Sequence, residues 1–141
     1  MTNPPVADQL AIQNLFSRYM WALDGGDVEG ILACFAPDGA LESPAVGRYA
    51  GHDGIREFAT RFSKFRERGA QMRHMISNIV TEVDGDRATA KCYLVVFITQ
   101  NEASRLLGPG RYDCRIKKVG GEWLFDNRLV VMDHDYVLEG I

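Results

Sequence analysis

The chain has 141 residues and a formal net charge of −3 at pH 7, and its composition, 46% hydrophobic and 25% charged, is that of a globular protein. A chain of this length buries roughly two-thirds of its unfolded surface, so we expect one hydrophobic core and a single domain over residues 1–141. Scattered basic residues give no reason to expect a nucleic acid as partner, and the lack of a leader pattern or of a run near ~20 apolar residues favours no membrane association and a cytoplasmic location.

Two helices are predicted at the start of the chain. The apolar residues between Ile12 and Leu23 recur at steps of four, three and four, so they lie on one face of an amphipathic helix that stops at Gly25-Gly26. Asp27 can cap a second, short helix that carries apolar residues up to Phe35. This helix ends before Pro37, because the residue ahead of a proline is disfavoured in the helical region.

A short irregular region then leads into a third helix. Glycine and proline interrupt alternating apolar residues from Gly39 to Gly51, which predicts two short strands or an irregular hairpin. From Asp53 to Arg68 the isoleucine and phenylalanine residues again follow a helical period, and Gly69 ends the element.

The second half of the chain is rich in Val, Ile, Tyr, Phe and Thr, a composition typical of strands. Asp84-Gly85 and Gly120-Gly121 can form tight hairpin turns, and a looser link over residues 100–110 joins the two hairpins. Helices first and a meander last predict an α+β fold, in which three helices pack on a strongly curved antiparallel sheet around a hydrophobic pocket. The four predicted strands are Gln71–Val83, Arg87–Thr99, Tyr112–Val119 and Trp123–Met132.

No metal site is predicted. Cys34, Cys92 and Cys114 are widely spaced and odd in number, so we expect buried, reduced thiols instead of disulfides or a metal motif. Asp133-His134-Asp135 is a poor ligand set, because adjacent strand residues point to opposite faces; a solvated chain end is the preferred interpretation.

Asp24 is unusual for its position at the end of the first predicted helix. The helix macrodipole disfavours a carboxylate there by roughly 0.3–1 kcal/mol, so helix stability alone favours a basic residue. The carboxylate is expected at the edge of the core. A solvated acid in a polar turn is the alternative, because Asp is common in turns, and a functional role therefore requires a partner.

His74 is the candidate partner. It lies on the first predicted long strand, where alternation places Met72 and Ile76 on the same face and Met75 on the other. A lone histidine among apolar neighbours can simply be a satisfied core residue. Paired with Asp24, however, it can act as a general base, because the carboxylate fixes the ring tautomer and stabilises the imidazolium.

The residues that face His74 depend on the strand register. A tight turn at Asp84-Gly85 sets His74 opposite Val95 and on the same face as Tyr93 and Phe97. These side chains would then border the pocket. A slip of one residue would replace them with Cys92, Leu94 and Val96.

Motifs along nearly the whole chain resemble the SnoaL-like proteins of the nuclear transport factor 2-like superfamily. This resemblance implies a cone of curved sheet closed by helices around a hydrophobic pocket. The superfamily includes scytalone dehydratase, lindane dehydrochlorinase, steroid delta-isomerase, polyketide cyclases and the small subunits of ring-hydroxylating dioxygenases. The motifs are Tyr19–Asp27, Phe35–Gly39, Gly51–Ile55, Arg73–Asn78, Gly110–Tyr112, and Trp123 ahead of Arg128.

The resemblance implies roles for several residues. Asp24 and His74 match the aspartate-histidine dyad of the dehydratase and dehydrochlorinase members, and Arg128 resembles an arginine that faces the pocket in some members. Tyr19 stands where the dehydrochlorinase has a lysine, which argues against halide elimination. Trp21 is expected to contribute to specificity, together with the pocket residues Val95 and Phe97 and their neighbours Met72, Ile76 and Tyr93.

The sequence therefore predicts a lyase or isomerase without a cofactor, acting on a small hydrophobic, cyclic or aromatic molecule. His74 is the base, Asp24 orients it, and Tyr19 or Arg128 donates a hydrogen bond to developing negative charge. The alternative is a non-catalytic binding protein or a dioxygenase small subunit. A homodimer or homotrimer is expected under either reading, because Met75 and Ile79 are predicted on the outer face of the sheet.

Overall fold

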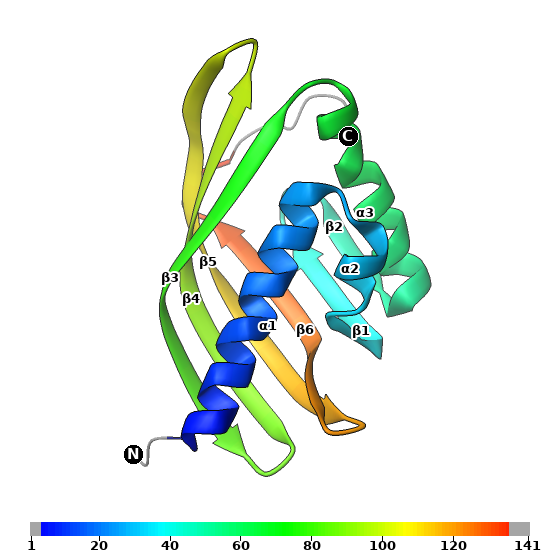
Figure 1. The fold of residues 1–141 in the computed structure, drawn as a ribbon, viewed down its shortest axis with the longest axis vertical. Coiled ribbons are helices and arrows are strands. Elements are labelled where there is room, and N and C mark those ends of the chain that lie inside the picture. Colours follow the sequence, from blue (N-terminus) through cyan, green and yellow to red (C-terminus); the bar gives the residue numbers. More distant parts are fainter. Residues whose placement is uncertain (1–3, 136–141) are drawn as a thin grey trace.

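The computed structural model describes residues 4–135, which form an α+β fold with the helices packed on a curved sheet. The α+β cone expected from the sequence is confirmed, and Figure 1 shows its arrangement. The elements in chain order are α1 (Val6–Gly25), α2 (Val28–Leu32), β1 (Phe35–Ser43), β2 (Gly47–Ala50), α3 (Gly51–Glu67), β3 (Gln71–Asp84), β4 (Arg87–Gln100), β5 (Ala103–Val119) and β6 (Glu122–Met132).

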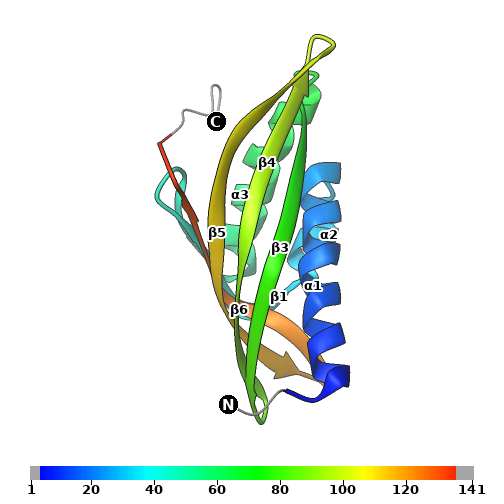
Figure 2. The ribbon, with the colours of Figure 1, turned by 90° about the vertical axis from the view of Figure 1, so that its left-hand side faces the viewer.

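The strands form one sheet in the order β2-β1-β6-β5-β4-β3. Turned by 90°, the molecule shows the long strands β3, β4 and β5 bending past the helices, which lie on one side of the sheet (Figure 2). Neighbouring strands are antiparallel except β1 and β6, which are parallel. The sequence did not predict this parallel pair, because Phe35 was assigned to the second helix, whereas it begins β1 opposite Phe125.

The helix ends follow the chemistry of their residues. The Asp27 side chain accepts a hydrogen bond from the Gly30 N–H at 3.0 Å and caps α2, as predicted. Gly26 adopts a left-handed conformation with φ of 66° and ends α1. These two turns fix the position of the last residues of α1, including Asp24.

The loose link predicted over residues 100–110 is too long, because β5 already begins at Ala103. A two-residue turn at Asn101 and Glu102, with φ of 53° and 63°, joins β4 directly to β5. Positive φ at both positions suits a tight hairpin, but Glu is not a residue that signals it. Gly108-Pro109-Gly110, which falls within the predicted link, instead lies within β5.

The predicted register of β3 and β4 is also wrong. The turn lies over Gly85 and Asp86, and a bulge at Asn78, with φ of 57°, shifts the pairing further along β3. His74 consequently pairs with Val96 instead of Val95. Because a shift of one residue exchanges the two faces, the side chains that point inward from β4 are Cys92, Leu94 and Val96.

The bulge has a second consequence for β3. Ile79, predicted on the outer face, is turned inward and packs against the core, whereas Val80 is 48% exposed. Met75 lies before the bulge and keeps its predicted outward position. The core between helices and sheet includes aromatic rings of Phe16, Tyr19, Phe35 and Phe125 in mutual contact.

Candidate functional site

Asp24 and His74 meet at the rim of the core, where the end of α1 crosses the start of β3. His74 Nδ1 lies 2.5 Å from Asp24 Oδ1, and the His74 backbone N–H donates to Asp24 Oδ2 at 2.9 Å. The His74 side chain is 7% exposed and the Asp24 side chain is 10% exposed. Both carboxylate oxygens are therefore engaged by one residue, which fixes the imidazole relative to the acid.

The backbone around Asp24 is tied to two neighbouring elements. The Asp24 carbonyl oxygen accepts a hydrogen bond from Gln71 Nε2 at 2.9 Å and from Arg66 Nη1 at 3.3 Å. A guanidinium beside the last carbonyls of α1 offsets the negative end of the helix dipole. This cation makes a carboxylate tolerable at the end of the helix, where the sequence alone disfavoured one.

The pairing defines which nitrogen of His74 can accept a proton. An acidic partner at Nδ1 holds the proton of the neutral ring on that nitrogen, so that Nε2 carries the lone pair. Among residues 4–135 no hydrogen bond is made to Nε2, and His74 borders an internal cavity. Such an arrangement can act chemically as a general base supported by a carboxylate.

The cavity lies between the concave face of the sheet and helices α1 and α3. Its volume of about 40 Å³ holds roughly three water molecules. Ser43 and Met132 also border an outer hollow of about 280 Å³, so these two side chains stand between the cavity and that hollow. The cavity is lined by Tyr19, Leu23, Leu41, Ser43, Val46, Phe58, Phe62, His74, Leu94, Val96, Tyr112, Arg128, Val130 and Met132.

Arg128 is the charged residue buried most deeply beside this cavity, at 2% exposure. Its guanidinium lies between two aromatic rings, 3.9 Å from the centroid of Tyr19 and 3.8 Å from that of Tyr112. Nη1 donates to the Tyr19 hydroxyl at 3.2 Å, whereas Nε and Nη2 have no hydrogen-bond partner among the described residues. Cation–π contacts thus hold the guanidinium while two of its nitrogens remain unsatisfied.

Burial keeps the hydroxyls around Arg128 protonated. It raises the pKa of Tyr19 to about 12, although the charge of Arg128 acts in the opposite direction. Burial likewise raises the pKa of Tyr112. At neutral pH neither tyrosine supplies a negative charge to the guanidinium, and no carboxylate in the described part of the chain forms a salt bridge with it.

Several predicted pocket residues lie elsewhere. Trp21 is 79% exposed on the outer side of α1, and Tyr93 and Phe97 are 61% and 38% exposed on the outer face of the sheet. Val95 points outward together with Tyr93 and Phe97, because the shifted register turns these alternate residues of β4 to the outer face. These four assignments are corrected by the structure, whereas Tyr19, His74 and Arg128 do border the cavity.

Met72 and Ile76 occupy an intermediate position. They share the inward face of β3 with His74, as predicted, but neither belongs to the cavity lining. Met72 is fully buried in the core, and Ile76 packs against it. Both support the strand that carries His74.

Sequence reasoning missed most of the apolar wall. Leu94 and Val96 belong to the alternative register, which a correct placement of the bulge selects. Phe58 and Phe62 were recognised only as the apolar face of a helix. Their spacing is the same whether such side chains fill a core or border a cavity.

The three cysteines are free and buried, as predicted. Burial raises the pKa of Cys92 to about 11 and that of Cys114 to about 12, so both remain thiols at neutral pH. Within residues 4–135, no three His, Cys, Asp or Glu side chains converge as potential metal ligands. No helix in this range is long and apolar enough to cross a bilayer.

Comparisons with known proteins agree with this fold. The family model of the SnoaL-like domain matches residues 4–129, whereas none of the curated proteins compared matches the chain. A variant of a Mycobacterium tuberculosis protein of unknown function is 32% identical over 94% of this chain and 78% of that chain, with a TM-score of 0.81. A Nostoc punctiforme protein of unknown function with a cystatin-like fold is 30% identical over 94% and 96%, with a TM-score of 0.79.

One further solved structure contains a ligand. A Catenulispora acidiphila protein in complex with S-DNPA is 24% identical over 92% of this chain and 96% of that chain, with a TM-score of 0.80. At this identity the similarity establishes a shared fold.

Proposed function

The chain belongs to the SnoaL-like domain family within the nuclear transport factor 2-like fold, and on that premise we propose that it is a cofactor-independent lyase or isomerase. Its substrate is a small hydrophobic molecule, cyclic or aromatic, and His74 removes a proton from an activated carbon of that substrate. Asp24 orients the ring and stabilises the imidazolium that forms. The ligand in the Catenulispora acidiphila protein supports a small-molecule role for this fold.

The observation that carries the proposal is the geometry of the pair. A 2.5 Å contact from Asp24 Oδ1 to Nδ1 leaves Nε2 as the basic nitrogen of a residue that borders an otherwise mostly apolar cavity. In such surroundings the attraction between a carboxylate and an imidazolium is stronger than it would be in water. The proton removed by Nε2 can return at another carbon, or its departure can accompany loss of a leaving group.

Proton abstraction can be tested without the natural substrate. In deuterated water, a panel of small cyclic ketones should lose their acidic C–H signals in proton NMR spectra faster with the protein than without it. His74→Ala should lower the exchange rate by about 10²–10⁴-fold, the usual contribution of a general base, and Asp24→Asn should lower it less. Trp21→Ala, an exposed change on the same helix as Asp24, is the matched control.

The competing role is a non-catalytic one, either as a binding protein for an apolar ligand or as a dioxygenase small subunit. If His74→Ala exchanges deuterium at the wild-type rate, the catalytic proposal fails. Co-purification with an iron-sulfur large subunit would then favour the subunit role.

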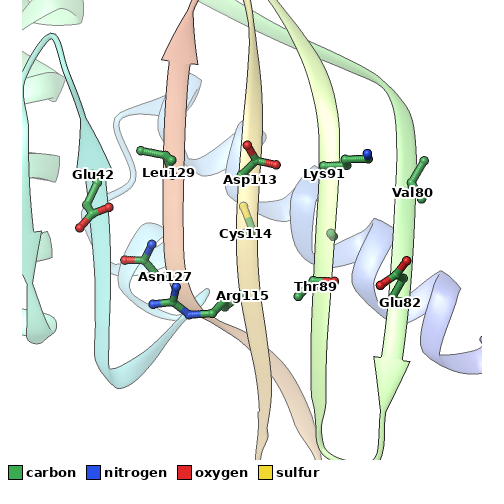
Figure 3. Close-up of a pocket in the computed structure, with 11 residues that line it drawn as sticks. Glu42, Val80, Glu82, Thr89, Lys91, Asp113, Cys114, Arg115, Asn127 and Leu129 are labelled. Atoms are coloured by element: carbon green, nitrogen blue, oxygen red, sulfur yellow. The ribbon is translucent and has the colours of Figure 1, made fainter.

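We also propose that the protein assembles as a homodimer or homotrimer through the outer face of its sheet. Exposed apolar side chains gather there: Tyr93 is 61% exposed, Met75 59% and Leu106 53%. Next to them, a shallow trough of about 450 Å³ crosses the strands, and Figure 3 shows it with α1 behind the sheet. The trough combines Glu82 and Asp113 with Lys91 and Arg115, charges that a second copy can complement.

A cytoplasmic location is proposed as well. Three free, buried thiols suit a reducing compartment.

A further inference from the structure

Arg128 has a feature that the proposed proton transfer does not use. Within residues 4–135, its Nε and Nη2 have no hydrogen-bond partner although the residue is 2% exposed. Buried polar groups are nearly always satisfied, and an unpaired buried charge is especially costly. Such a residue persists where something outside the protein completes its hydrogen bonds.

We infer that Arg128 is the recognition group for a carboxylate carried by the ligand of this cavity. The sequence left Tyr19 or Arg128 as the donor to negative charge, and the contacts distinguish them. The Tyr19 hydroxyl already accepts from Arg128 Nη1, whereas Arg128 retains two free donors and a full positive charge. The ligand is then a hydrophobic ring compound that bears a carboxylic acid.

The shape of the unsatisfied group favours this class of ligand. Nε and Nη2 lie on one edge of the planar guanidinium, and their parallel N–H bonds match the two oxygens of a carboxylate. The rings of Tyr19 and Tyr112 cover the two faces of the plane, so that only the edges can accept a further partner. A carboxylate would also supply the counter-charge that the described residues do not provide.

The position of Arg128 is consistent with a ligand that also reaches the base. Arg128 and His74 border the same cavity, which is otherwise lined mainly by apolar and aromatic side chains. A ligand anchored by its carboxylate at Arg128 would place its apolar part among these side chains. This inference rests on the proposed function only in that the same cavity receives the ligand.

Acetate is a suitable probe, because the cavity of about 40 Å³ can hold a molecule of its size, and acetamide is its neutral equivalent. In ¹⁵N-labelled protein, added acetate should shift the side-chain Nε–H signal of Arg128 saturably. Acetate should bind at least tenfold more tightly than acetamide. Assignment follows from the signal that disappears in Arg128→Met. Equal responses to both probes, or no response to acetate, would overturn the inference.

Two variants separate this inference from the proposed proton transfer. His74→Ala should keep the acetate response while losing deuterium exchange, because it leaves the guanidinium intact. In Arg128→Met, acetate binding is followed by saturation transfer from the protein to the acetate methyl signal. Binding that persists there with unchanged affinity would place the anion elsewhere and overturn the inference. Should Arg128→Met fail to fold, Arg128→Lys, which also lacks the Nε–H group, supplies the assignment. The Nε–H titration of the unaltered protein and of His74→Ala then decides the matter.

Discussion

Two charged residues are placed where the physics of the fold disfavours them. Asp24 ends a helix whose dipole repels it, and Arg128 is buried with two unsatisfied nitrogens. Each is compensated locally, Asp24 by the N–H and ring of His74 and Arg128 by two tyrosine rings. Arg128 and His74 border the same cavity, and Asp24 contacts His74, which is why we propose a function for this region.

From the burial of the Tyr19 hydroxyl we predict how the stability of the protein changes at high pH. Burial raises its pKa to about 12, whereas an unfolded tyrosine titrates near 10. Between these values the unfolded chain releases a proton that the folded protein retains. The stabilising contribution is therefore complete below pH 10 and declines as the pH rises toward 12.

Tyr19→Phe should consequently flatten this decline, by about 1 kcal/mol per pH unit between pH 10 and 12. Urea unfolding at intervals from pH 9 to 11.5 measures it. Tyr93→Phe, on the outer face of the sheet, is the control and should follow the wild-type curve. Parallel curves for Tyr19→Phe and the wild type would contradict the burial argument.

Among the elements, β1 and β6 carry Ser43 and Met132, the two residues that border both the cavity and the outer hollow. Met132, which separates the cavity from the outer hollow, packs against Gly110 on the neighbouring strand. A ring-sized ligand needs far more than 40 Å³, so its entry requires side chains at the entrance to move. Methionine suits such a position, because its side chain has three rotatable bonds.

Gly110→Ala tests how closely these two strands approach. An added Cβ would lie 2.6 Å from the Val131 carbonyl oxygen and 2.8 Å from Met132 Sδ. We expect the free energy of unfolding to fall by about 1–3 kcal/mol, because the backbone contact cannot relax by a rotamer change. Chemical denaturation provides the value.

Gly25→Ala is the matched control, since its added Cβ would approach no atom closer than 3.8 Å. It should change stability by less than about 0.5 kcal/mol. If both variants unfold at the same denaturant concentration, the strands are not as tightly apposed as described.

At the scale of the whole molecule, the curved sheet has two faces with different roles. The concave face carries the cavity, and the other face carries exposed apolar residues beside charged ones. Large exposed apolar patches on soluble proteins mark interaction sites. The proposed assembly would bury this face and leave the cavity accessible from its rim.

Tyr93→Lys should therefore dissociate the assembly, because it places a charge at the centre of the apolar group. Size-exclusion chromatography with light scattering at several concentrations should give a monomer mass for this variant and a larger mass for the wild type. Trp21→Lys, at an exposed aromatic position on the helix layer, should leave the mass unchanged. A wild-type monomer at every concentration would rule out the assembly.

Much of the fold could be predicted because its signals are local. The helical spacing from Ile12 to Leu23, the cap at Asp27 and the β-rich second half each depend on neighbouring residues in the chain, and all appear in the structure. The candidate pair was found for a related reason: Asp24 conflicts with its own helix end, and that conflict is visible in the sequence.

The rest depended on contacts between distant segments. A single bulge at Asn78 decided which face of β4 meets His74, and it removed Tyr93, Val95 and Phe97 from the pocket. Asn78 tolerates a positive φ, but an asparagine alone does not predict a bulge, because strand pairing depends on packing across the whole sheet. Only the folded molecule brings the faces of Tyr19 and Tyr112 against Arg128, so its two unsatisfied nitrogens, and the ligand chemistry they imply, could not be deduced from the sequence.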